Sequence, residues 1–193
     1  MEAPYCISSQ LKDQTPIELR LVGPHDRERL LNGFARISIQ TNIDRFHTFK
    51  KRFSEPEIKY LLTIDNVNHL AIGAIDCSKR QDVGIGLARY IRTAARPDHA
   101  EVAIVIIDAY QGKGLGKILY LELMKMAYQN NIRTFINIVG KDNQAMQHLL
   151  RSFNATKYFE NDHVYEFSVD LAMAINREKF PIKYSPIQQH SLH

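Results

Sequence analysis

The feature that most constrains the fold of this chain is an apolar run that leads into a glycine-rich turn. Residues 102–107 are six consecutive apolar residues, five of them β-branched, which predicts a strand covered on both faces of a sheet. Gly112, Gly114 and Gly116 follow, and apolar residues then recur at helical spacing as far as Tyr128. This segment predicts a buried strand, a tight turn and a helix within an α/β protein.

The glycines indicate a ligand that carries phosphate. Glycines at a helix start let the main chain approach a ligand closely, and N–H groups point outward there beside the positive end of the helix dipole. A P-loop needs four residues between its first glycine and a Gly-Lys pair, but only three separate Gly112 from Gly116. The dinucleotide fingerprint G-x-G-x-x-G needs its third glycine one position later. The remaining alternatives are a different phosphate site and a connection without a ligand.

Composition and charge limit the class of protein. The 193 residues, of which 45% are hydrophobic and 24% charged, predict one globular domain with a sizeable core. The first ten residues do not resemble a secretion signal, no segment reaches transmembrane length, and Cys6 and Cys77 give no metal-site spacing. We therefore expect a cytoplasmic protein without a metal, membrane or nucleic-acid partner. Its net charge of +4 favours a polyanionic ligand.

The other elements are predicted from periodicity and capping signals. Ser54 and Glu57 form a capping box that starts one helix, and Asn143 starts another. Residues 1–16 are expected to be an irregular lead-in and residues 172–193 a loosely packed tail, which leaves 17–171 as the domain. Strands are predicted at 17–22, 69–75, 83–91, 100–107, 133–139, 156–159 and 164–169, and helices at 26–37, 54–62, 114–128 and 143–150.

A basic and aromatic segment, residues 45–53 (RFHTFKKRF), lies between the first two predicted helices. Contact with nucleic acid or an anionic membrane surface is one interpretation. The favoured interpretation is a solvated segment whose three phenylalanines pack onto the domain, because basic clusters occur in proteins of many functions. A third interpretation is that the segment lines a ligand cleft.

The spacing of Gln111, Gly114 and Gly116 after an apolar strand resembles the Q-x-x-G-x-G acyl-CoA-binding motif of the GNAT N-acetyltransferase superfamily. The predicted order of strand, two helices, three strands, helix, strand, helix and two strands is also the GNAT order. The resemblance covers residues 17–171. It implies a mixed, mostly antiparallel central sheet that is flanked by helices and contains a splayed pair of central strands.

The same resemblance implies acetyl-CoA as co-substrate, with its arm between the splayed strands. Main-chain groups of Ile104, Val105 and Ile106 would bind the pantetheine. Asn143 would contact the CoA arm, although a plain helix cap is an equally good interpretation of this residue. The pyrophosphate would be held by main-chain N–H groups of the turn, that is of Gln111, Gly112, Lys113, Gly114, Leu115 and Gly116.

A further set of residues resembles the acetyltransferase domain of bacterial protein-lysine acetyltransferases of the Pat type. The matching segments are Arg45-Phe46, Phe53-Ser54, residues 57–61, Asp65 and residues 69–71. This resemblance implies a protein lysine as acceptor. Pat-type enzymes usually carry an additional regulatory domain, for which a chain of this length has no room.

Acetyl transfer to an amine needs a neutral nitrogen, and a lysine side chain with a pKa of about 10.4 is almost fully protonated near pH 7. A general base, worth about 10²–10⁴-fold in rate, is therefore useful. Glu101 is the candidate, because it opens the apolar strand, is expected to be partly buried there, and matches the glutamate of Pat-type enzymes. The alternative for Glu101 is a solvated carboxylate. Weaker candidates for the base are His69, Asp76 and His99.

Two further groups complete the predicted chemistry. The oxyanion would be met by a main-chain N–H near Ile104. Leu150 occupies the position, seven residues after Asn143, where many GNAT enzymes carry a tyrosine acid, so the usual acid is absent. The sequence thus predicts acetyl transfer from acetyl-CoA to a primary amine, with a protein lysine as first choice. A small-molecule amine acetyltransferase and a non-catalytic acyl-CoA sensor are the alternatives, and the sequence makes no prediction of the oligomeric state.

Overall fold

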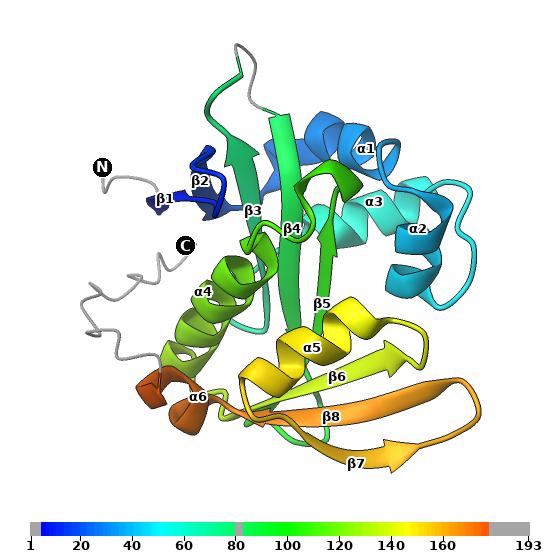
Figure 1. Ribbon diagram of the computed structural model, residues 1–193, viewed down its shortest axis with the longest axis vertical. Coiled ribbons are helices and arrows are strands. Elements are labelled where there is room, and N and C mark those ends of the chain that lie inside the picture. The colour runs from blue at the N-terminus through cyan, green and yellow to red at the C-terminus, as the bar shows by residue number, and fades with distance from the viewer. Residues whose placement is uncertain (1–4, 80–82, 178–193) are drawn as a thin grey trace, which may run out of the picture.

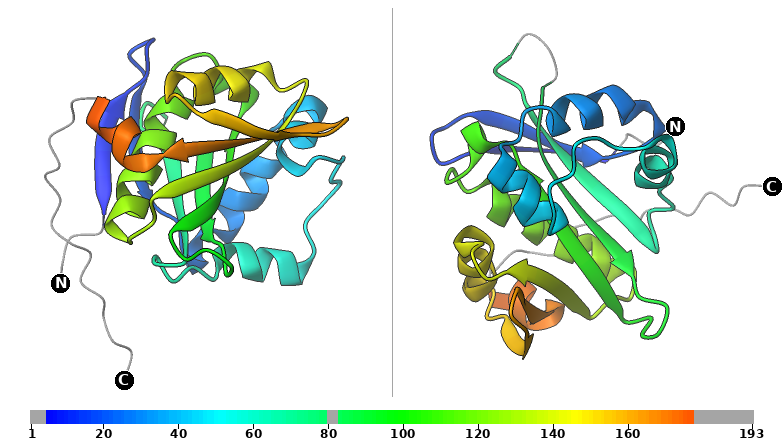
Figure 2. Two further views of the ribbon diagram at one scale, coloured as in Figure 1. Left: turned by 90° about the horizontal axis from the view of Figure 1, so that it is seen from below. Right: turned by 90° about the vertical axis from the view of Figure 1, so that its right-hand side faces the viewer.

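The computed structural model describes residues 5–79 and 83–177, which form an eight-stranded sheet with helices on both faces (Figure 1, Figure 2). The strand order is β1-β2-β3-β4-β5-β6-β8-β7, and all neighbouring pairs are antiparallel except β5 and β6. The strands are β1 Cys6–Gln10, β2 Pro16–Leu21, β3 His69–Asp76, β4 Val83–Arg92, β5 His99–Ile106, β6 Thr134–Gly140, β7 Thr156–Glu160 and β8 Val164–Asp170. The helices are α1 Arg27–Phe34, α2 Ile39–Phe46, α3 Glu55–Leu62, α4 Leu115–Gln129, α5 Gln144–Ser152 and α6 Leu171–Arg177.

Side-chain alternation along the strands gives the sheet two different core layers. A Cβ on Gly86 of β4 would lie 3.1 Å from Leu115 of α4, so this face of the sheet packs closely against α4. On the opposite face, Ala71 and Leu87 pack with Ile58 and other apolar residues of α1 and α3. The central sheet is therefore covered by α4 on one side and by α1–α3 on the other.

The parallel pair β5 and β6 separates along its length. Pairing is confined to His99 with Thr134, Ala100 with Phe135 and Glu101 with Ile136, and Figure 1 shows the two strands diverging beyond this point. Both strands continue well past it, to Ile106 and Gly140. The mixed, mostly antiparallel sheet and its splayed central pair confirm the predicted fold class.

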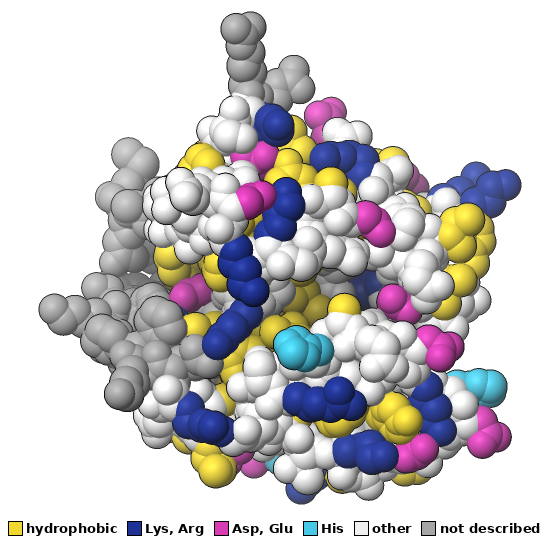
Figure 3. All heavy atoms as spheres, viewed as in Figure 1, with side chains coloured by type: hydrophobic (Ala, Val, Ile, Leu, Met, Phe, Trp, Pro, Cys, Tyr) yellow, Lys and Arg dark blue, Asp and Glu magenta, His cyan; other side chains and the backbone are white. Residues whose placement is uncertain are grey.

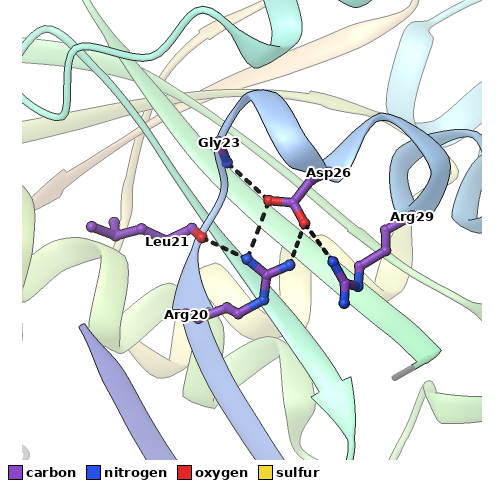
Figure 4. Close-up of polar contacts among 5 residues, drawn as sticks. All are labelled: Arg20, Leu21, Gly23, Asp26 and Arg29. Atoms are coloured by element: carbon purple, nitrogen blue, oxygen red, sulfur yellow. Dashed lines mark hydrogen bonds and ion pairs between the residues drawn. The ribbon is translucent and has the colours of Figure 1, made fainter. Parts of the chain in front are cut away.

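A buried carboxylate fixes the connection between β2 and α1 (Figure 4). Asp26 is 5% exposed, and it accepts hydrogen bonds from the Gly23 N–H at 2.9 Å, from Arg29 at 3.2 Å and from both terminal nitrogens of Arg20. Burial alone would raise the pKa of Asp26, but these charged and main-chain donors outweigh it and lower the pKa. The cluster holds α1 against the sheet, where Asp26 lines a small cavity together with Arg45 and Arg89.

The prediction for the region between the first two expected helices is wrong. The predicted helix at 26–37 ends at Phe34, and a separate helix, α2, follows at Ile39–Phe46. Two apolar residues of α2, Ile39 and Ile43, are exposed, so the segment does not bury the apolar stripe by which helices are recognised. Polar contacts contribute to holding α2, including those between Asn42 and the main chain of Lys50 at 2.8 and 2.9 Å.

The described segments nearest the two ends of the chain are more ordered than the sequence predicts. Residues 1–16 were expected to be irregular, but Cys6–Gln10 forms β1, which pairs with β2. The expected loose tail begins instead with α6, in which Leu171, Ala174 and Ile175 are buried. The rest of the predicted tail, from residue 178, lies outside the described residues. None of the helices within 5–79 and 83–177 is long and apolar enough to cross a membrane.

Candidate active site

A cleft of about 1270 Å³ opens where β5 and β6 separate, and its walls come from α2, α5 and the start of α4. Figure 3 shows a hollow with an apolar floor on this face, bordered on one side by a run of Lys and Arg side chains. With the exception of Leu115, every predicted site residue lines this cleft: Glu101, Ile104, Val105, Ile106, Gln111, Gly112, Lys113, Gly114, Gly116 and Asn143. The Leu115 side chain is 1% exposed and belongs to the core, so only its main chain can serve the cleft.

The three glycines of the turn have two different roles. Gly112 and Gly114 have φ of 72° and 89°, a left-handed conformation that other residues adopt only with strain. Gly116 has ordinary φ, but a Cβ at this position would lie 3.3 Å from Ile106 Cδ1. The first two glycines therefore shape the turn, while the third lets α4 approach β5.

The main-chain N–H groups of the turn also fall into two sets, one that bonds within the protein and one that is open to a ligand. The Gln111 N–H donates to the carbonyl of Asp108 at 3.1 Å and so is not free for a ligand, in contrast to the prediction. Ile118 donates to the carbonyl of Gly114 at 3.2 Å. The N–H groups that precede Ile118 in the first turn of α4 have no helical acceptor, and they lie at the positive end of the helix dipole. An anionic diphosphate fits this cradle.

The Gln111 side chain has a structural role. Its amide nitrogen donates to the Thr41 hydroxyl and to the carbonyl of Ile106, both at 3.0 Å, and so ties α2 to the end of β5. Asp108 strengthens this link, because its carboxylate accepts hydrogen bonds from the N–H and hydroxyl of Ser38 at 2.8 and 2.6 Å. Burial alone would raise the pKa of Asp108, but the bonds from Ser38 and Thr41 outweigh it and lower the pKa.

The register of β5 narrows the predicted pantetheine contacts. The Ile107 N–H donates to Ile85 of β4, so by alternation the main-chain polar groups of Val105 also face β4. Those of Ile104 and Ile106 face the gap toward β6. Of the three predicted residues, only Ile104 and Ile106 present main-chain hydrogen-bonding groups to the cleft.

Helix α5 forms the opposite wall. The Asn143 side chain accepts a hydrogen bond from the Met146 N–H at 2.9 Å, so it is a true N-cap, and it also lines the cleft. Leu150 is completely buried, so this position of α5 faces the core and presents no group to the cleft. His148 is exposed and lines the cleft from the same helix.

Glu101 lies where β5 and β6 part, at the last paired position of the two strands. Its side chain is exposed, so the predicted partial burial is wrong. The weaker candidates do not line the cleft. His99 contacts Asp98 at 2.8 Å, and Asp76 accepts a hydrogen bond from the Tyr110 hydroxyl at 2.6 Å. His69 has Nδ1 3.1 Å from the carbonyl oxygen of Thr63.

The basic and aromatic segment combines two of its predicted roles. Phe46 and Phe53 pack against Phe34, with ring centroids 6.0 and 4.5 Å away, whereas Phe49 is exposed. Lys50 forms an ion pair with Glu57 at 2.5 Å. The segment also reaches the cleft through its first three residues, Arg45, Phe46 and His47.

Several lining residues were missed by sequence reasoning. Gln10 and Lys12 reach the cleft because β1 adds to the sheet edge and the turn after it touches the glycine turn, where the Lys12 N–H donates to the carbonyl of Lys113 at 3.0 Å. Arg89 lines the cleft from the middle of β4. A lone arginine inside an apolar strand pattern was the one local signal available for any of these residues.

Comparison with known proteins agrees with this geometry. The sequence model of the acetyltransferase (GNAT) family matches residues 28–154. The acetyltransferase Pat of Mycolicibacterium smegmatis is 31% identical over 160 residues, which are 79% of this chain and 45% of that protein. The chain therefore spans less than half the length of this relative.

Solved structures share the fold. The GNAT domain of S. lividans PAT has a TM-score of 0.79 and 24% identity over 88% of this chain and 99% of that one. The spermidine N-acetyltransferase of Vibrio cholerae, in complex with CoA and spermine, has a TM-score of 0.65 and 19% identity over 83% of this chain and 98% of that one. The chain belongs to the GNAT family of acyl-CoA-dependent N-acetyltransferases, with Pat acetyltransferases among its relatives.

Proposed function

We propose that this protein transfers the acetyl group of acetyl-CoA to the side chain of a protein lysine, with Glu101 as general base. The observation that carries the proposal is the position of Glu101 at the point where β5 and β6 separate. In the same cleft, the left-handed Gly112 and Gly114 expose main-chain donors suited to a diphosphate. A cleft of about 1270 Å³ is large enough for the CoA arm.

Acetyl-CoA supplies the activated thioester, and the chain holds it. The first-turn N–H groups of α4 bind the pyrophosphate, the gap-facing main chain of Ile104 and Ile106 binds the pantetheine, and Asn143 contacts the arm while its oxygen caps α5. The Ile104 N–H also lies within the part of β5 that can meet an oxyanion. The Lys12 side chain adds a positive charge beside the turn.

Glu101 accepts the proton that the lysine ammonium must lose before its nitrogen attacks the thioester carbon. As the carbon–nitrogen bond forms, the carbon–sulfur bond breaks and CoA leaves as a thiolate. Since Leu150 is buried in the core, the thiolate takes its proton from solvent or leaves unassisted. Exposure of Glu101 in the free protein keeps it open to an incoming amine, and a docked acceptor would cover it.

Two observations support a protein lysine over a polyamine. Pat relatives match most of this chain, whereas likeness to the spermidine enzyme extends to the fold alone. The acceptor end of the cleft carries Arg45 and Arg89, which would repel a polycation. We place the reaction in the cytoplasm, where the thiols of Cys6 and Cys77 stay reduced.

The test compares wild type with Glu101→Gln on folded acyl-CoA synthetases, other proteins and spermidine, by acetyl-CoA consumption. The variant should lose about 10²-fold or more in kcat/KM near pH 7, and the deficit should shrink at high pH as the amine deprotonates unaided. Acetyl-CoA binding should be unchanged, and Glu28→Gln, an exposed substitution on α1, is the control. An unchanged pH–rate profile would refute the role of Glu101 as general base. Faster turnover of spermidine than of any protein would refute a protein lysine as acceptor. No turnover of any amine would favour a non-catalytic acyl-CoA sensor.

A further inference from the structure

We propose that Arg89 and Arg45 form a binding site for a carboxylate that the acceptor carries close to its reactive amine. This inference extends the proposed function. It depends on that function for acetylation of the amine, whereas binding of the carboxylate can be tested without it. It specifies the acceptor as an amine with a nearby negative charge. The carboxylate comes either from a residue that flanks a protein lysine or from a small amino acid.

Arg89 is a buried cation with incomplete hydrogen bonding. The residue is 3% exposed, and the one hydrogen bond of its side chain within the described residues runs from Nη2 to the carbonyl of Leu61 at 3.0 Å. Nε and Nη1 are buried and have no hydrogen-bond partner among residues 5–79 and 83–177. Leaving buried donors of a charged group unpaired is costly, so an anion that fills both positions would bind favourably.

Arg45 doubles the positive charge at this place. Its guanidinium carbon lies 4.9 Å from the centroid of the Phe46 ring, and within the described part of the chain neither arginine forms an ion pair with a carboxylate. Burial lowers the pKa of each arginine to about 10, and repulsion by Arg45 contributes to the shift of Arg89. Both therefore remain charged at neutral pH, close enough to interact.

The neighbouring groups do not neutralise the pair. Asp26 shares a small cavity of about 110 Å³ with Arg89 and Arg45, but it is already paired with Arg20 and Arg29. Burial, followed by the charge of Arg89, lowers the pKa of His69, which stacks on the Tyr60 ring. Asp44 lines the cleft and accepts a hydrogen bond from Gln40 at 2.9 Å. The positive field of the two guanidiniums is thus directed into a partly closed, mainly apolar space.

The site lies at a useful distance from the proposed base. Arg89 pairs with Ala103 and Ile91 pairs with Glu101, so the Arg89 and Glu101 side chains emerge on the same face of the sheet from neighbouring strands. Such diagonal neighbours are separated by roughly 7–8 Å. This separation is comparable with the length of a lysine side chain. An amine at Glu101 therefore brings a carboxylate of the same or an adjacent residue to the guanidiniums.

A carboxylate fits the pair better than a larger anion. The fork of a guanidinium matches the two oxygens of a carboxylate, and the adjoining cavity is small and lined largely by apolar side chains. A free polyamine has no group for this position. The same charges that disfavour a polycation therefore select an acceptor with a negative charge near its amine.

Two matched pairs of acceptors test the site and distinguish its two sources of carboxylate. Free lysine is compared with cadaverine, which lacks only the carboxylate, and a peptide with Lys-Glu is compared with the same peptide with Lys-Gln. Wild type should favour the carboxylate member of at least one pair by about tenfold or more in KM. Arg89→Met should remove this preference by raising the KM of the carboxylate member to that of its uncharged partner.

A second variant and a binding measurement keep the test decisive if the first variant misfolds. Arg45→Gln changes a less buried residue, should reduce the same preference, and decides the question if Arg89→Met does not fold. Arg177→Gln, at the exposed end of α6, is the control. Without catalysis, Nε-acetyl-lysine should stabilise wild type against heat more than N-acetylcadaverine does, and this difference should disappear in the variants that lack an arginine.

Failure of this inference can be told apart from failure of the proposed function. Acetylation of peptides regardless of the flanking charge, with equal KM for lysine and cadaverine, would overturn the carboxylate site and leave the protein acceptor standing. A preference for lysine without acetylation of any peptide or protein would support the site and refute the protein acceptor. A preference that survives in both arginine variants would also overturn the site.

Discussion

The two halves of the cleft are built in different ways. The half that we propose binds acetyl-CoA comes mainly from one continuous segment, residues 101–117, and offers largely main-chain groups. The half that we propose for the acceptor is assembled from side chains of β4, α2 and α3, such as Arg89, Arg45 and Tyr60. The first half needs few specific side chains apart from its glycines, while the second depends on packing between distant segments.

This difference separates recognition of the phosphate, which is general, from recognition of the acceptor, which is specific. Main-chain donors at a helix start recognise phosphate in any sequence that adopts the turn. Side chains held by tertiary packing can change one at a time, so they distinguish one acceptor from another. The GNAT family resemblance follows from the first half, and we expect acceptor selectivity to follow from the second.

The largest expected effect is on the turn. Gly114→Val should abolish the rise in melting temperature that acetyl-CoA causes, because φ of 89° strains a β-branched residue and the new side chain would occupy the cradle. For wild type, ligand at 100 times its Kd should stabilise the fold by about 2.7 kcal/mol. Thermal unfolding with and without acetyl-CoA measures the difference.

Gly140→Val is the matched control for that substitution. Gly140 ends β6, does not have positive φ, and has open space where a Cβ would lie, so this variant should respond to acetyl-CoA as wild type does. If Gly114→Val folds normally and binds acetyl-CoA as tightly as wild type, the turn does not hold the pyrophosphate.

The same division explains what the sequence could predict. The strand, turn and α4 were predicted because their signals are local: an apolar run, three glycines and a helical period. The Ser54 capping box at the start of α3 was confirmed for the same reason. Nearly every residue predicted for the site from this segment also lines the cleft.

The remainder depends on contacts between distant segments. Strand β1 is an edge strand whose pairing with β2 no local pattern announces, and α2 exposes Ile39 and Ile43 while polar contacts fix it. The Gln111 N–H was assigned to the ligand because the turn at Asp108 that uses it cannot be read from spacing. Arg89 acquires its role only when α2 brings Arg45 beside it.

The second prediction concerns the support of the acceptor half. Asp26→Asn should lower the free energy of unfolding by about 2 kcal/mol near pH 7, because the variant loses the charged acceptor for Arg20 and Arg29. The folded-state pKa of Asp26 is lowered. Its contribution is therefore present above the unfolded pKa of about 3.9 and is lost as the pH falls through the folded pKa.

Chemical denaturation from pH 7 down to pH 3 checks that sign. The gap in unfolding free energy between wild type and Asp26→Asn should be largest at neutral pH and should narrow as the pH falls below about 4. Because α1 and not the turn is loosened, acetyl-CoA affinity should change less than acceptor KM. A gap that is constant with pH, or a larger effect on acetyl-CoA than on the acceptor, would contradict the division into two halves.

The smallest expected effect tests a positive charge that the acetyl-CoA half takes from outside residues 101–117. Lys12 follows β1, lies 3.4 Å from where a Cβ of Gly114 would be, and lines the cleft beside the turn. Its side chain is exposed, so its attraction for a pyrophosphate is that of a screened surface charge. Lys12→Gln should weaken acetyl-CoA binding by roughly threefold at low salt, and the difference should fade as salt is raised.

Lys59→Gln, on the exposed side of α3 and outside the cleft, should have no such effect. Calorimetric titration with CoA at two salt concentrations measures both variants, and a loss far larger than threefold that persists in high salt would mean that this half depends on a specific side chain after all.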